Sequence, residues 1–120
     1  MLFRSGGMAA IEQIFGIFDA GNSGDLDIAF DRTRILVESN CTCGLHLHRN
    51  RFQDSPNLWS EQEQVVASEV ERYYKKAKEI IALNREFLEK VADALAKKKI
   101  LVMADIKKIK ESCRIVSVNL

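Results

Sequence analysis

The second half of the chain has the more regular pattern of apolar and polar residues. Between positions 66 and 95 a hydrophobic position recurs every three or four residues, and Glu, Lys and Arg fill most of the positions between. The recurring positions are Val66, Val70, Tyr73, Ala77, Ile80, Asn84, Phe87 or Leu88, Val91 and Leu95, of which Asn84 alone is strongly polar. This spacing places the side chains on one helical face. It predicts a long amphipathic region whose stripe from Val66 to Leu95 is largely buried.

Two features set the limits of helices in this region. Ser60 and Glu63 have the spacing of a capping box, which predicts that the first helix spans Ser60–Leu83. Asn84 is either a buried polar residue within one long helix or the N-cap of a second helix. A helix of ~35 residues exceeds the usual globular length. We therefore favour two helices, the second over Arg85–Lys97, with Lys97, Lys98 and Lys99 at the end where cations are favourable.

The remaining segments predict shorter elements. A short helix is expected over Met8–Phe15, stopped by Gly16, and a second over Ser23–Glu38 after a Gly- and Asn-rich turn. Helical spacing returns over Met103–Cys113. Residues 41–48 break the helical pattern, so we expect at most a short strand or extended segment near 45–49. The sequence therefore predicts a mainly α-helical bundle that forms a single domain over residues 1–120.

Composition and charge exclude several classes of protein. The 120 residues are 47% hydrophobic and 29% charged, with one Pro, which is typical of one globular domain and not of a disordered chain. A net charge of +1 provides no overall field to attract nucleic acid or an anionic membrane. Residues 1–59 carry a net charge of −2 and residues 60–120 one of +3, which indicates a solvated basic face on the long amphipathic region. No apolar run approaches the ~20 residues of a membrane-spanning helix.

The cysteines and histidines form the first candidate metal site. Cys41, Cys43, His46 and His48 are all residue types that bind zinc. Each pair is separated by a single residue, whereas structural zinc sites use spacers of about two to four residues. We therefore expect these histidines to bind no structural metal. Three cysteines, two of them one residue apart, also indicate free thiols in a reducing compartment, with Cys113 as the third.

A second candidate cluster is acidic. It comprises Asp19, Asp25, Asp27 and Asp31, around the predicted start of a helix. Acidic residues favour helix N-termini, so composition alone predicts only a favourable helix start. The chain contains no nucleophile elbow, phosphate loop or dinucleotide fingerprint. Self-contained catalysis is therefore not predicted from these motifs.

Three stretches of the chain follow a known family pattern in the same order. Residues 7–16, Gly-Met-Ala-Ala-Ile-Glu-Gln-Ile-Phe-Gly, are similar to a G-R-A-A-E-E-x-x-F-G segment. Residues 20–26, ending in Asp25-Leu26, are similar to T-G-A-S-N-D-L. Residues 69–95 contain E-V-x-R and Y-x-x-A segments followed by Asn84-Arg85. Together these stretches resemble the C-terminal helical part of the peptidase domain of FtsH-type ATP-dependent zinc metalloproteases, over about residues 5–112.

The resemblance implies a role for Asp25. In this family, two His of an H-E-x-x-H helix and the Asp of T-G-A-S-N-D-L hold zinc, which makes Asp25 the candidate third ligand in the complete protease. The resemblance further implies protein substrates, a hexameric ring, an ATPase module outside this chain and a membrane contact only through segments that this chain lacks. The expected location is the cytoplasm, or the cytoplasmic face of the membrane for a full-length protease. No nucleic-acid partner is expected, because lysines alternate with acids along the chain.

The departures from the pattern leave two hypotheses. The chain lacks H-E-x-x-H, Ile11 replaces the first Glu of the family pair, and Gly24 replaces the Asn before the ligand. The isolated chain is therefore expected not to cleave peptides. It is either a portion of an FtsH-like metalloendopeptidase or a free-standing, catalytically degenerate helical module that keeps the fold and associates with itself.

Overall fold

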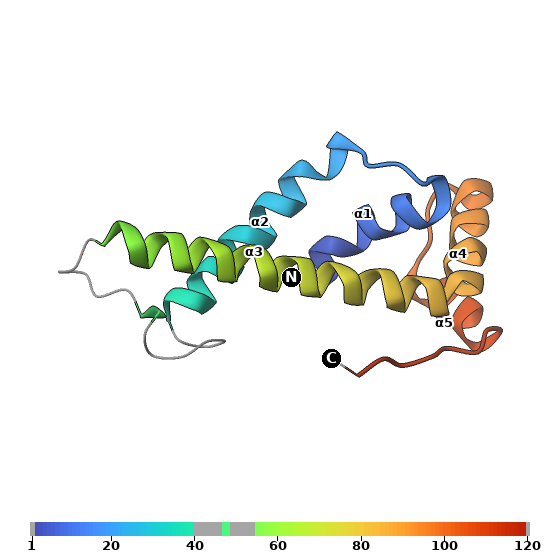
Figure 1. Cartoon of the computed structure of the whole chain (residues 1–120). Helices are drawn as coiled ribbons and strands as arrows, with labels where there is room; N and C mark the ends of the chain where they lie inside the picture. Colours follow the sequence, from blue (N-terminus) through green and yellow to red (C-terminus); the bar gives the residue numbers. More distant parts are fainter. Residues whose placement is uncertain (1, 40–46, 49–54, 120) are drawn as a thin grey trace.

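The computed structural model describes residues 2–39, 47–48 and 55–119 (Figure 1). These residues form helices without strands, which confirms the mainly α-helical fold. The elements are α1 (Leu2–Phe15), the short 3₁₀ helix η1 (Ala20–Asn22), α2 (Ser23–Glu38), α3 (Pro56–Leu83), α4 (Arg85–Lys98) and α5 (Met103–Glu111). Of the extended segment expected near 45–49, only Leu47 and His48 are described. Leu47 lies in a 3₁₀ turn and is buried.

Helix α3 begins before the predicted start at Ser60. The Ser55 hydroxyl accepts a hydrogen bond from the Leu58 amide (3.4 Å), and Pro56 occupies the first helical turn, where its missing N–H leaves no partner unsatisfied. Ser60 therefore lies inside the helix. The carboxylate of Glu63 pairs instead with Arg34 of α2, at 2.8 Å from Nη2. The predicted capping box was wrong because a tertiary ion pair and an earlier cap replace it.

The predicted division at Asn84 is confirmed. Helix α3 ends at Leu83, and its final turn is completed by the Asn84 amide, which donates to the carbonyl oxygens of Ile80 and Ile81 at 3.1 and 3.2 Å. Helix α4 then runs across the end of α3 (Figure 1). Asn84 occupies the N-cap position of α4, but its side chain makes no capping hydrogen bond there.

Helix α1 is longer than expected at its start and ends as expected. It begins at Leu2 rather than Met8, so Gly6 and Gly7 lie within it. At its end the Gly16 amide donates to the Glu12 carbonyl oxygen (2.9 Å), and Gly16 has a φ of 67°, which a side chain would disfavour. Gly16 therefore stops the helix as predicted, and the structure supplies the reason. The bounds of α2 are those predicted from the sequence.

The core lies where α1 and α2 pack against α3 (Figure 1). Small residues at four-residue spacing face this core and let the helices approach closely. The buried residues in these helices are Ser5 and Ala9 of α1, Ala29, Thr33 and Val37 of α2, and Gln62, Val66, Val70 and Ala77 of α3. The Gln62 amide donates to the Leu47 carbonyl oxygen (2.7 Å), which ties the connection after α2 to α3.

Helices α4 and α5 contain no buried residue. The molecule measures 56 × 28 × 24 Å and its radius of gyration is 18.0 Å, against ~14 Å for a compact domain of this length. The apolar stripe is correspondingly buried at Val66, Val70 and Ala77, half-buried from Ile80 to Val91, and exposed at Leu95. Burial of the whole stripe was therefore too broad a prediction, because α4 extends beyond the α1–α2–α3 core.

Candidate functional site

Asp25 lies in the first turn of α2, where its carboxylate faces α1. The Asp25 Oδ1 atom is 2.9 Å from Nη1 of Arg4, and the Asp25 side chain is 42% exposed. Its backbone position is the one that the family resemblance requires, at the start of a helix. Its described partner is a guanidinium group rather than another ligand side chain. The position can offer a carboxylate to an ion, provided that Arg4 releases it.

The other acids of the candidate cluster do not join Asp25. Asp19 is the N-cap of η1, and its Oδ1 atom accepts from the Gly21 amide at 3.0 Å. Asp27 and Asp31 are exposed on α2. The acidic run thus serves the start of the helix at Asp19, which is the interpretation that composition alone favoured.

Of the candidate cysteine–histidine cluster, Cys41, Cys43 and His46 lie outside the described residues, which include only His48; the third cysteine, Cys113, is also described. His48 is exposed, and Cys113 is a half-buried free thiol. In the described ranges, no three His, Cys, Asp or Glu side chains are placed to hold a metal ion together. These residues by themselves do not fit the zinc site of the family, because Asp25 has no second or third ligand beside it.

A polar cluster joins α1 to the middle of α3, and sequence reasoning missed it. The Tyr74 hydroxyl donates a hydrogen bond to Oε2 of Glu12, and Nζ of Lys78 lies 3.3 Å from Oε1 of the same carboxylate. The Lys78 ammonium also lies over the Tyr74 ring, 5.0 Å from its centroid. The cluster therefore links residues 62 and 66 positions apart in the sequence.

Protonation of this cluster is set by its hydrogen bonds. The hydrogen bond from the Tyr74 hydroxyl has the largest effect on the pKa of Glu12 and lowers it. Burial raises this pKa but by less, and Lys78 lowers it further. Burial, together with the hydrogen bond to Glu12, raises the pKa of Tyr74 far above its ordinary value. Near neutral pH, Glu12 is therefore an acceptor and Tyr74 a donor. The pair is suited to holding two helices together rather than to moving a proton.

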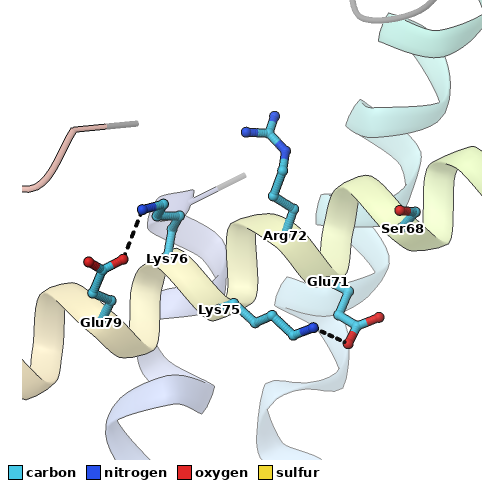
Figure 2. A pocket seen from close by; sticks show the side chains of 6 residues that line it. All are labelled: Ser68, Glu71, Arg72, Lys75, Lys76 and Glu79. Atoms are coloured by element: carbon cyan, nitrogen blue, oxygen red, sulfur yellow. Dashed lines mark hydrogen bonds and ion pairs between the residues drawn. The ribbon is translucent and has the colours of Figure 1, made fainter.

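The outward face of α3 forms a shallow depression of about 380 Å³ (Figure 2). It is lined by Ser68, Glu71, Arg72, Lys75, Lys76 and Glu79, all from this one helix. Figure 2 shows Lys75 paired with Glu71 and Lys76 with Glu79, each at 2.9 Å. Arg72 pairs with Glu69 at 2.9 Å. Because a carboxylate neutralises each of these cations, the depression has the charge balance of a solvated helix face and not of an anion site.

An apolar groove of about 280 Å³ lies between the end of α1 and the middle of α4. Its lining residues are Ala10, Ile11, Ile14, Phe15, Leu88, Glu89, Ala92 and Asp93. Phe15 is 70% exposed at the end of α1, and Ile17 and Phe18 beyond it are also exposed. The periodic stripe indicated that Leu88 faces a partner. It could not indicate that a groove remains between Leu88 and the end of α1.

Comparison with known proteins adds no relative: no protein-family model, curated protein or solved structure matches this chain. Among the described helices, each is too short or too polar to cross a bilayer. The resemblance to FtsH-type proteases therefore rests on the residues quoted above. The function that follows is proposed from those residues and from the geometry of the fold.

Proposed function

We propose that this chain is a helical portion of the peptidase domain of an FtsH-like ATP-dependent zinc metalloendopeptidase. In this role it acts in the proteolysis of protein substrates but does not cleave peptides on its own. The chain supplies the helical support of the domain and one carboxylate, Asp25. The H-E-x-x-H helix and the ATPase module belong to segments that it does not contain.

The observation that carries the proposal is the contact between Glu12 and Tyr74. Glu12 is the second Glu of the stretch that resembles G-R-A-A-E-E-x-x-F-G, and Tyr74 is the Tyr of the stretch that resembles Y-x-x-A. The two residues hydrogen bond across the α1–α3 interface. A chance likeness between two separate stretches provides no reason for their matching polar residues to meet. A shared fold does, because it brings the two stretches together at the α1–α3 interface.

The placement of Asp25 agrees with the same proposal. It opens a helix, its carboxylate is accessible, and α1 lies on the side that it faces. A carboxylate in a first helical turn can reach an ion held mainly by other residues, as three-ligand catalytic zinc sites require. Asp25 is accordingly the candidate third zinc ligand of the complete protease.

The test is reconstitution of the peptidase domain. The chain is joined to an upstream segment from an FtsH-type protease that carries the H-E-x-x-H helix, and zinc content and casein cleavage are measured. Asp25→Asn should abolish cleavage and weaken zinc binding. Asp27→Asn, an exposed acid two residues along the same helix, is the matched control and should retain both. Full cleavage by the Asp25→Asn protein would remove the site assignment, and absence of cleavage by the unmutated protein would argue against the protease proposal.

A second candidate function is a catalytically degenerate helical module that associates with itself. The exposed apolar side chains favour it, since Phe15 at the end of α1 and Ile17 and Phe18 just beyond it are exposed, while α4 and α5 bury none of their residues. Apolar surface at a helix end beside an open groove is typical of an interaction site. Sedimentation velocity over a wide concentration range tests this function. A strict monomer at high concentration would contradict it.

A further inference from the structure

The apolar groove between α1 and α4 has a complementary apolar and basic segment on the same chain. The floor of the groove is formed by aliphatic side chains such as Ile11, Ile14 and Leu88. Its α4 side carries Glu89 and Asp93. Glu89 is paired with Arg85 at 2.7 Å, whereas Asp93 has no cation partner among the described residues. The groove therefore offers an apolar surface beside one carboxylate, that of Asp93, which makes no ion pair within the described residues.

The complementary segment is the connection between α4 and α5. Lys99 ends α4 with a φ of 66°, and residues 100–102 follow without helical structure before α5 begins. Ile100 is 76% exposed and Val102 is 59% exposed, whereas Leu101 between them is half-buried. Alternate residues of an extended chain face the same side. Both side chains on the outward side are thus aliphatic and in contact with solvent.

Lysines precede and follow these exposed side chains. Lys97 and Lys99 lie immediately before Ile100 and have no ion-pair partner in the described part of the chain, whereas Lys98 pairs with Asp105 at 2.9 Å. Residues 97–103 run from the last two residues of α4 to the first residue of α5, and we call this stretch the α4–α5 connection. It therefore combines apolar side chains with positive charge outside any ion pair. The connection and the groove are both apolar, and their charges are of opposite sign. Within one copy the two do not meet, because the groove is open and Ile100 is exposed.

We infer that the α4–α5 connection of one copy binds in the α1–α4 groove of a second copy. Ile100 and Val102 cover the aliphatic floor, and Lys97 and Lys99 face Asp93 and Glu89. The occupant is a second copy because the exposed apolar side chains and the positive charge that the groove would take are both present on this chain. The inference specifies the contact surface for the self-association proposed above, and it rests on that association. Apolar burial supplies most of the attraction, and charge selects the orientation of the two copies.

The first test removes the apolar contact by Ile100→Ser with Val102→Ser in the full chain. Because both residues are exposed, these changes should leave the helix content of the circular dichroism spectrum unchanged. The self-association constant from sedimentation velocity should fall at least about tenfold. Ile35→Ser is the matched control, since Ile35 is similarly exposed but belongs to α2, which contributes no residue to the groove or to the connection. The self-association constant of this variant should not change.

The second test exchanges the charges. Asp93→Lys alone and Lys97→Glu with Lys99→Glu should each weaken self-association, because the groove and the connection then carry the same sign. Mixed in equal amounts, the two proteins should form a mixed pair. The basic connection of the Asp93→Lys protein then meets the groove of the Lys97→Glu, Lys99→Glu protein, which keeps Asp93. The acidic connection of the second protein meets the groove of the first, which now carries a lysine. Self-association that none of these changes affects would overturn the inference while leaving self-association itself intact. A chain that is monomeric without any substitution would overturn both.

Discussion

The side-chain amide of Asn84 binds both backbone polar groups of Val116. Its Nδ2 atom donates to the Val116 carbonyl oxygen at 2.9 Å, and its Oδ1 atom accepts from the Val116 amide at 2.8 Å. The same Nδ2 atom also donates to the Ile80 carbonyl oxygen at 2.9 Å. The residue that separates α3 from α4 therefore also holds the chain after α5 against this junction.

Asn84→Ala should release the segment around Val116 and destabilise the fold by about 1–2 kcal/mol, since several hydrogen bonds are lost from a half-exposed site. Amide hydrogen exchange at Val116 should accelerate. Asn84→Asp keeps the acceptor and loses the donor, so its exchange rate should fall between the two. Equal protection of Val116 in all three proteins would contradict the contact.

Tyr74→Phe should reduce stability near neutral pH and reduce the acid dependence of unfolding. The pKa of Glu12 is lowered in the folded protein. The contribution of ionised Glu12 to the free energy of unfolding is therefore complete above the ordinary carboxyl pKa of about 4.3. It is lost as the pH falls through the lower pKa that Glu12 has in the folded protein. Urea unfolding from pH 7 to pH 3 measures this. Tyr73→Phe is the control, because Tyr73 does not contact Glu12 and its change should leave the acid dependence as it is.

Gly6→Ala and Gly7→Ala should differ in effect although the residues are neighbours in α1. A Cβ atom at Gly6 meets nothing within 4 Å, so Ala should stabilise the helix by about 0.5–1 kcal/mol. A Cβ atom at Gly7 lies 3.0 Å from Oδ1 of Asn22, which must move. Thermal unfolding should therefore give a lower melting temperature for Gly7→Ala than for Gly6→Ala. The opposite order would show that Asn22 does not approach α1.

Val66→Ala and Leu95→Ala should separate the core from the outer part of the apolar stripe. Val66 is completely buried, and losing two methyl groups there should cost about 2 kcal/mol. Leu95 is exposed in this chain, so its truncation should cost less than about 1 kcal/mol in the monomer. Chemical denaturation at low protein concentration makes the comparison. A large loss for Leu95→Ala there would indicate that α4 packs more deeply than the structure shows.

Asp25→Asn should leave the stability of the isolated chain within about 1 kcal/mol. The Arg4–Asp25 ion pair is exposed, and such pairs contribute about 0–1 kcal/mol. Arg4→Ala should have an equally small effect on unfolding. This pair of measurements makes a loss of cleavage in the reconstituted protease attributable to the lost carboxylate. Unfolding of the Asp25→Asn chain would instead give that residue a structural role.

The sequence by itself determined which segments are helical but not where α1 and α3 begin, because the signals of a helix are local. The three- and four-residue spacing, the glycine at position 16 and the break at Asn84 each depend on residues within one or two turns. These signals predicted the bounds of α2 and the division between α3 and α4. They could not determine the start of α3, where Ser55-Pro56 and Ser60-Glu63 both resemble helix starts and the ion pair from Arg34 engages Glu63.

Only the tertiary structure decided which part of the apolar stripe is buried and which polar residues meet. The spacing is the same at Val66 and at Leu95, but Val66 packs in the core with Val37 of α2 and with Leu47, whereas Leu95 is exposed. Glu12 and Tyr74 carry no mark of partnership in the sequence, since 62 residues separate them. Periodicity records which face of a helix is apolar, whereas burial and pairing depend on which other helix lies against that face. The groove between α1 and α4 follows from that arrangement, because the chain changes direction at Asn84 and the end of α1 does not cover the apolar residues of α4.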